Sequence, residues 1–264
     1  MSAIRVRALA TTPLKGAALQ FPESVELEAG GVAGNRAFHL IDERGHMVNG
    51  KRAGALATVR AEHFPAAARL ILRLPDGTVV AGEVAPGGER VETSFYGRPV
   101  AGRVLEGPWA AALSDFLGLS LRMVKADRPG AAVDVHPVTI ASAQSLTALA
   151  PLAGARVDGR RFRMLIELDG GEPFGEERWI GRTLRIGSAR VRVGERVVRC
   201  AVITQDPDSG RVDSPLLRVL RDERRARDSA AGRPRPDREA ITFGVYATVS
   251  HPGRVSVGDE VEVA

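Results

Sequence analysis

The sequence predicts a mainly β protein with a few helices, an α+β fold whose strands form a barrel or a sandwich. Short apolar runs separated by glycine-rich turns recur through the first hundred residues, a pattern typical of such β architectures. The chain has 264 residues, of which 44% are hydrophobic. This length allows one large or two small domains, and this composition supports a full core.

The strands are predicted by alternation and by turn residues. Residues 4–10 alternate apolar with polar or small side chains, which is the period of a half-buried strand. A hairpin is expected over residues 38–48, and a second over 70–80, where Asp76-Gly77 supplies the turn. Further strands are expected at 91–95, 99–104, 241–246 and 260–263.

Two helices are predicted by capping residues. Apolar residues at helical spacing follow Pro108 as far as Leu117, and Gly118 ends the run. Ser142 is a good N-cap for a helix over residues 143–149, which Pro151 should stop.

A third, weaker helix is expected from Pro215 to about Arg224. The stretch Arg221–Arg238 has almost no apolar side chains beyond alanine and carries two prolines. Its first residues could finish the helix, and the rest is expected to be a mobile surface loop. The alternative is a lid or a docking site for a redox partner.

The charge balance favours a small anionic ligand. The chain has 37 lysines and arginines against 32 acidic residues. Nucleic-acid sites cluster their cations, whereas these are spread along the chain, which argues against a nucleic-acid partner. Arginine holds phosphate through a bidentate fork. No apolar run long enough for a membrane span and no signal peptide is expected, so a cytoplasmic protein is the default expectation.

Cys200 is the single cysteine of the chain, which excludes a disulfide within it. Three roles remain open: a buried apolar side chain, a reactive thiolate or a soft metal ligand. Arg199 and Arg196 supply nearby positive charge, which favours a thiolate. The turn signal Asp206–Gly210 follows closely, and sites for chemistry are often built where strands enter loops.

Several common sites are absent from the sequence. The five histidines show no zinc-ligand spacing, and no Walker, dinucleotide-binding or Gly-x-Ser-x-Gly motif occurs. Pyridoxal phosphate is not expected. No flavin or iron–sulfur module is visible, so electrons for any redox reaction would come from a separate protein or reductant.

The Cys200 segment nevertheless resembles a known family. Arg199-Cys200, an apolar run, Thr204 and Asp206–Gly210 are similar to the cysteine loop of MOSC-domain proteins, in particular the mitochondrial amidoxime reducing component and its bacterial relatives. The resemblance extends over nearly the whole chain. Its other segments are Thr12–Gly16, Gly34–Leu40, Gly45–Val48, Ile140–Ser142, Arg161–Arg163, His251–Gly253 and Val257–Val261.

This resemblance implies two domains, an N-terminal β-rich domain over residues 1–115 packed on a MOSC β-barrel over residues 116–264. It implies a molybdenum-cofactor (Mo-molybdopterin) oxidoreductase that reduces N-hydroxylated or N-oxygenated small molecules, with electrons from a ferredoxin- or cytochrome-type protein. The alternative is a non-catalytic protein that carries the cofactor or its sulfur.

The resemblance also implies roles for residues. Cys200 would be the molybdenum ligand. Ser142, at its helix start, and Arg163 would hold the cofactor phosphate, and Arg36 would contact the pterin. Three departures from the family pattern are Gly16, which replaces a serine, Asn35, which replaces the acidic partner of Arg36, and Met164-Leu165, which replace a proline and an asparagine. The remaining cofactor-contacting positions would be Lys15, Gly16, Lys51, Arg199 and Phe243, although Lys51 could equally be surface charge and Phe243 a core aromatic.

Overall fold

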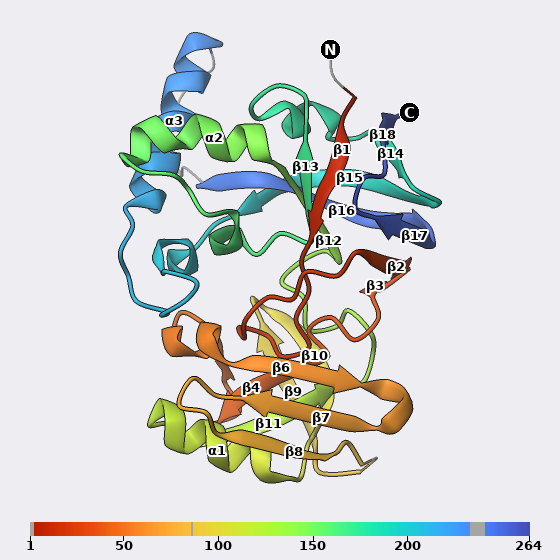
Figure 1. Cartoon of the computed structure of the whole chain (residues 1–264), viewed down its shortest axis with the longest axis vertical. Helices are drawn as coiled ribbons and strands as arrows, with labels where there is room; N and C mark the ends of the chain where they lie inside the picture. Colours follow the sequence, from red (N-terminus) through yellow and green to blue (C-terminus); the bar gives the residue numbers. More distant parts are fainter. Residues whose placement is uncertain (1–2, 86, 233–240) are drawn as a thin grey trace.

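A computed structural model describes residues 3–85, 87–232 and 241–264 of the chain. Within these ranges the chain folds into two β-rich halves, one above the other in Figure 1, which confirms the predicted mainly β architecture. The upper half in that view is a barrel, and the lower half contains two smaller sheets. No helix within these ranges is both long and apolar enough to cross a membrane.

The barrel is a seven-stranded sheet in the order β1-β13-β12-β16-β15-β14-β18. Backbone hydrogen bonds join its two edges: the Val6 N–H donates to the Asp259 carbonyl and the Val261 N–H to the Ile4 carbonyl, both at 2.8 Å. Alternate side chains such as Leu184 fill the interior. The strands are β1 (Arg5–Leu9), β12 (Val138–Ser142), β13 (Ile166–Asp169), β14 (Thr183–Ile186), β15 (Ala189–Val198), β16 (Thr242–His251) and β18 (Val261–Val263).

The lower half packs a five-stranded sheet, β5-β4-β11-β10-β9, and a three-stranded sheet, β6-β7-β8, around one core. Trp109 is fully buried in this core, and its indole N–H donates to the Leu70 carbonyl at 3.0 Å. The elements are β4 (Phe38–Asp42), β5 (Met47–Val48), β6 (Arg60–Phe64), β7 (Arg69–Arg73), β8 (Val79–Glu83), β9 (Arg90–Phe95), β10 (Arg98–Val104), α1 (Pro108–Leu117), β11 (Leu121–Ala126) and the 3₁₀ turns η1 (Gly54–Thr58) and η2 (Pro65–Ala67).

Sheet membership corrects the predicted boundary at residue 115. Strand β11, beyond that boundary, pairs with β4 and β10 of the lower half. Strand β1, before it, pairs with β13 of the barrel, and β2 (Ser24–Glu28) pairs with β3 (Gly31–Val32) and β17 (Gly253–Ser256). The halves are therefore interleaved along the chain, because β1 to β3 belong with the barrel and the lower half ends after Ala126.

The structure confirms the predicted hairpins at 38–48 and 70–80. It also confirms helix α1, which ends with a left-handed cap at Gly118. The predicted stop at Pro151 is wrong. Helix α2 (Ala143–Ala153) contains Pro151 and ends at Gly154, whose φ is 71°. Proline here removes one backbone hydrogen bond only two residues before the helix ends, so the helix tolerates it.

The third predicted helix, from Pro215 to about Arg224, is present but longer than expected, so the surface loop predicted to follow it is wrong as far as Ala230. Helix α3 (Leu216–Ala230) continues through this stretch, and Glu223 and Arg224 are buried in it. Its charged side chains are paired inside the protein: Arg224 and Arg227 both contact Glu177 of η4 (Gly175–Trp179). Residues 233–238 of the predicted loop lie outside the described residues.

Candidate functional site

Cys200 lies where β15 passes into the 3₁₀ turn η5 (Ala201–Thr204), as the sequence predicted for a strand-to-loop position. Its side chain is partly exposed and lines a cavity of about 110 Å³. Both halves of the molecule contribute to the wall. The lower half supplies Lys15, Gly16, Arg36, Asn49, Gly50, Ala57 and Tyr96, and the connecting segment packed against it supplies Asp134. The barrel half supplies Thr139, Arg161–Arg163, Val197–Cys200, Val202, Ile203, Gln205 and Tyr246.

Three arginines of this wall have no acidic partner. Within the described residues, the guanidinium groups of Arg36, Arg163 and Arg199 donate only to backbone carbonyls and the Met164 sulfur, and none forms an ion pair. Arg163 donates to Ala17 O at 2.6 Å, across the two halves, and Arg199 donates to Phe162 O at 2.9 Å. Buried cations normally have carboxylate partners. The cavity therefore carries uncompensated positive charge.

The pKa values of these groups show the same imbalance. Burial, together with the positive charge of Arg36, lowers the pKa of Arg163 to about 10. Burial also lowers the pKa of Arg199 to about 10, although Tyr246 and Asp134 act in the opposite direction. Both guanidinium groups remain charged at neutral pH. An anion in the cavity would relieve their mutual repulsion and replace the lost hydration.

Lys15 and Asp134 form the cavity's own ion pair. The Lys15 ammonium donates to Asp134 Oδ1 at 2.5 Å and to the Ala132 carbonyl at 2.9 Å. Burial lowers the pKa of Lys15 to about 8 despite the opposing effect of Asp134. Burial favours protonation of Asp134, but the charges of Lys15 and Arg36 outweigh it and hold the pKa of Asp134 at about 2. This site thus keeps a carboxylate and holds a proton on Lys15 Nζ that can be released near neutral pH.

Two tyrosines flank the thiol. Burial, then the charges of Asp134 and Cys200, raise the pKa of Tyr96, and burial raises that of Tyr246 to about 12. Both phenols are therefore neutral hydroxyl groups at physiological pH. Sequence reasoning missed both, because an isolated tyrosine in a strand or a turn carries no signal of its own.

The loop that follows Cys200 is fixed by ion pairs. Arg161 contacts Asp213 through two hydrogen bonds of 2.7 and 2.9 Å, and Arg160 contacts Asp208 through two of 2.7 Å. Gln205 reaches the lower half and donates to the Gly50 carbonyl at 2.7 Å. The acidic turn recognised in the sequence therefore serves as the partner of the arginines that precede Phe162.

Three predicted site residues lie outside the cavity. The Ser142 hydroxyl caps α2, as predicted, but the buried carboxylate of Glu176 accepts a hydrogen bond from it at 3.2 Å. That carboxylate occupies the helix start, so Ser142 and Arg163 do not share a ligand site. Phe243 is buried beneath the cavity, stacked on Phe162. Lys51 lies outside, with its ammonium 5.5 Å from the Tyr96 ring centroid.

The surroundings of Arg196 also differ from the prediction that it supplies positive charge near Cys200. Its guanidinium donates to Glu177 at 3.0 Å, so its charge is directed at that carboxylate. Arg199 is the neighbour of Cys200 that lines the cavity. Of the predicted positions, the structure thus brings together Lys15, Gly16, Arg36, Arg163, Arg199 and Cys200.

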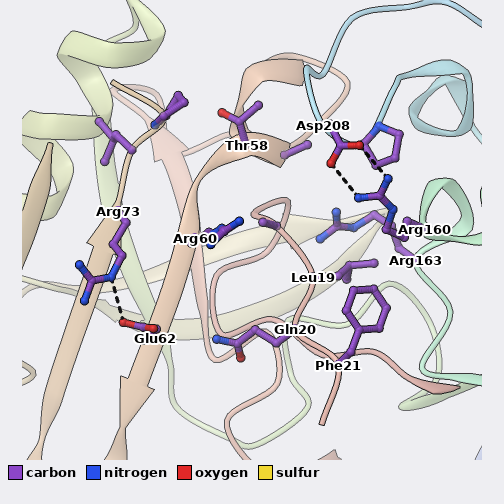
Figure 2. A pocket seen from close by; sticks show the side chains of 15 residues that line it. Leu19, Gln20, Phe21, Thr58, Arg60, Glu62, Arg73, Arg160, Arg163 and Asp208 are labelled. Carbon is purple, nitrogen blue, oxygen red and sulfur yellow. Dashed lines mark hydrogen bonds and ion pairs between the residues drawn. The ribbon is translucent and has the colours of Figure 1, made fainter. Parts of the chain in front are cut away.

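A larger pocket of about 740 Å³ adjoins the cavity and shares Ala57 and Arg163 with it (Figure 2). Arg160 and Arg73 border this pocket, but they are paired with Asp208 and Glu62. Arg60 also borders it and makes no ion pair or hydrogen bond through its side chain with any residue of the described ranges. Leu19 and Phe21 add apolar surface.

No group of three or more histidine, cysteine or acidic side chains in the described chain could hold a metal ion, so a metal at Cys200 would depend on other ligands.

Comparison with solved structures gives weak similarities. The YUAD protein from Bacillus subtilis shares 11% identity at a TM-score of 0.45, over 99% of this chain and 96% of that one. YiiM from Geobacillus stearothermophilus shares 15% at a TM-score of 0.33, over 49% and 54%.

Comparison with curated protein sequences gives no match. A family model does match, and it describes the MOSC domain over residues 127–262. The match begins directly after β11, where the lower half ends, and it spans the Cys200 loop and most of the barrel. Proteins of this family are associated with the molybdenum cofactor. On this evidence, the chain belongs to the MOSC-domain family.

Proposed function

We propose that the cavity binds the molybdenum cofactor with the Cys200 thiolate as a metal ligand, and that the protein reduces N-hydroxylated or N-oxygenated small molecules. The observation that carries this proposal is a single partly exposed thiol in a cavity lined by three arginines without acidic partners. Thiolate is a soft ligand suited to such a metal, and arginine suits the anionic groups of the cofactor.

The residues present fit this group in charge and in donor type. The cavity at Cys200, about 110 Å³, is smaller than most ligand pockets, which measure roughly 300–1,000 Å³. The adjoining pocket supplies the missing volume, and Arg163 borders both spaces. Cys200 would hold the metal, and Arg36, Arg163 and Arg199 would balance the negative charge of the organic part.

The bound cofactor supplies the two-electron redox chemistry. The reaction breaks the N–O bond of R–NH–OH, consumes two electrons and two protons, and releases R–NH₂ and water. Lys15 Nζ, with its lowered pKa, can deliver a proton inside the cavity, and Asp134 holds the ammonium in place. The electrons would come from a separate ferredoxin- or cytochrome-type protein, because no flavin or iron–sulfur motif is visible in the sequence.

The test is a metal and pterin analysis of protein purified from a host that makes the cofactor, followed by reduction of hydroxylamine with a chemically reduced dye. We expect molybdenum and pterin in the wild type, both strongly reduced in Cys200→Ser, and substrate-dependent oxidation of the dye. A wild type without molybdenum or pterin would refute the proposal. Bound cofactor without turnover would instead show a carrier of the cofactor.

A further inference from the structure

Tyr96 has an unfavourable backbone conformation at the mouth of the cavity. It forms a two-residue turn with Gly97 between β9 and β10, and its φ is 53°. This left-handed conformation suits glycine or asparagine and is uncommon for a bulky side chain. The two-residue turn requires this conformation, but it does not require a tyrosine, and residues held in such conformations cluster at functional sites.

The turn places Tyr96 in the wall of the cavity that also contains the thiol. The side chain lines the cavity with Cys200, yet 56% of the residue remains exposed. The Lys51 ammonium lies 5.5 Å from the ring centroid, within the range of a cation–π contact. Because a tyrosine side chain has few rotatable bonds, ligand contact with its exposed surface would cost little conformational entropy.

Val198 offers a second exposed apolar surface from the other half of the molecule. It is the last residue of β15, two positions before Cys200, and is 62% exposed while lining the same cavity. Exposed apolar side chains are ordinary when scattered singly. Here two of them line the cavity that contains the thiol, one on each side of the junction between the halves.

We propose that Tyr96 and Val198 are specificity-determining residues that bind the flat apolar body of the substrate while its N–O group enters the cavity. This inference rests on the proposed function and names its substrate class as N-oxygenated compounds with an aromatic or similarly planar body. A cationic body would be repelled by Lys51 and the cavity arginines, so the body is neutral or anionic.

Two substrates that share the reacting group test this inference. The holoprotein, with a chemical reductant, is assayed with N-benzylhydroxylamine and with N-methylhydroxylamine. We expect the ratio of their kcat/KM values to favour the benzyl compound. In Tyr96→Asn this ratio should fall about tenfold, which corresponds to about 1.4 kcal/mol. Tyr96→Phe should retain the ratio, and Val198→Ser should lower it.

The matched control is Phe64→Ala, which removes an exposed apolar residue that lines neither the cavity nor the adjoining pocket. It should leave both kcat/KM values unchanged. Asparagine suits the left-handed turn, so Tyr96→Asn should not lower the melting temperature. An unchanged substrate ratio in a folded, molybdenum-containing Tyr96→Asn protein would overturn the inference.

A binding measurement separates this inference from the reductase itself. Benzamide and acetamide cannot be reduced through an N–O bond, and their affinities can be measured by NMR titration. Benzamide should bind the wild type about tenfold more tightly than it binds Tyr96→Asn, and acetamide should show no such difference. If the wild type reduces neither hydroxylamine, the proposed function fails while the binding test still stands. Equal benzamide affinities would reject the apolar site even if the reductase activity is found.

Discussion

Replacing Glu177 by glutamine should destabilise the protein strongly. Its carboxylate lies among three arginines: it accepts hydrogen bonds from Arg196 at 3.0 Å, Arg224 at 2.9 Å and Arg227 at 3.3 Å. The side chains of Glu177 and Arg224 are only 8% and 7% exposed. Glutamine keeps the shape but removes the charge, so Arg196 and Arg224 lose this carboxylate partner and Arg227 keeps, among the described residues, only its ion pair with Glu223. Breaking a buried pair in this way costs about 3–5 kcal/mol.

The pKa of Glu177 gives a similar magnitude. Burial alone would raise this pKa, but hydrogen bonds from Arg224 and Arg227 and their charges bring it down from 4.5 to about 2. Each tenfold change in proton affinity is worth about 1.4 kcal/mol, so the ionised carboxylate contributes on the order of 3 kcal/mol. Because the folded-state pKa is depressed, this contribution is present above pH 4.5 and is lost as the pH falls toward 2.

Urea unfolding of the wild type and Glu177→Gln at pH 7 measures the difference directly. We expect a loss of about 3 kcal/mol, which corresponds to a fall of roughly 6–12 °C in melting temperature. Glu172→Gln is the matched control, because the Glu172–Arg178 pair is 60% and 74% exposed and should change stability by less than about 0.5 kcal/mol. A loss below about 1 kcal/mol, or a difference that persists unchanged toward pH 2, would refute the reasoning.

Three further predictions concern the cavity. Cys200→Ser should abolish activity and metal binding, because oxygen is a harder ligand than sulfur. The free energy of unfolding in urea should change by less than about 1 kcal/mol. Full activity of this variant would remove the thiol from the mechanism. Arg163→Gln should reduce the pterin content about tenfold at limiting cofactor. Its stability should be unchanged, because no ion pair of Arg163 within the described residues is lost. An unchanged pterin content would place the cofactor phosphate elsewhere. Because the pKa of Lys15 is depressed to about 8, the unfolded chain binds more protons above that pH. The wild type should therefore gain about 2 kcal/mol relative to Lys15→Met as the pH rises from 8 to 10, and a constant difference would contradict this.

Local patterns predicted the strands and hairpins well, because their alternation and their turn residues are contained in a few neighbouring positions. Asp76-Gly77 and Gly118 specify a turn and a helix end without reference to the rest of the chain. The end of helix α3 was predicted too early for the opposite reason. Its charged residues suggested solvent, and only the distant Glu177 makes Arg224 a buried residue. The domain boundary failed likewise, since the pairing of β1 with β13 is a contact between distant residues.

The residues of the candidate site were likewise predicted only in part. The family resemblance supplied Cys200, Arg36 and Arg163, which the structure brings to one cavity. It could not show that Glu176 occupies the helix start at Ser142, because that carboxylate comes from a separate loop 34 positions later. Tyr96 and Asp134 were missed, since their importance depends on the folded junction between the two halves.

The closure of the barrel has a consequence for the order in which the protein can fold during synthesis. Residues 4–6 are synthesised long before their hydrogen-bond partners at 258–261. The lower half, complete at Ala126, can fold early, while β1 waits without its neighbours. A nascent chain halted before residue 258 should therefore contain a folded lower half and an open barrel sheet, in which β1 pairs with β13 on one side and leaves its other edge available to chaperones.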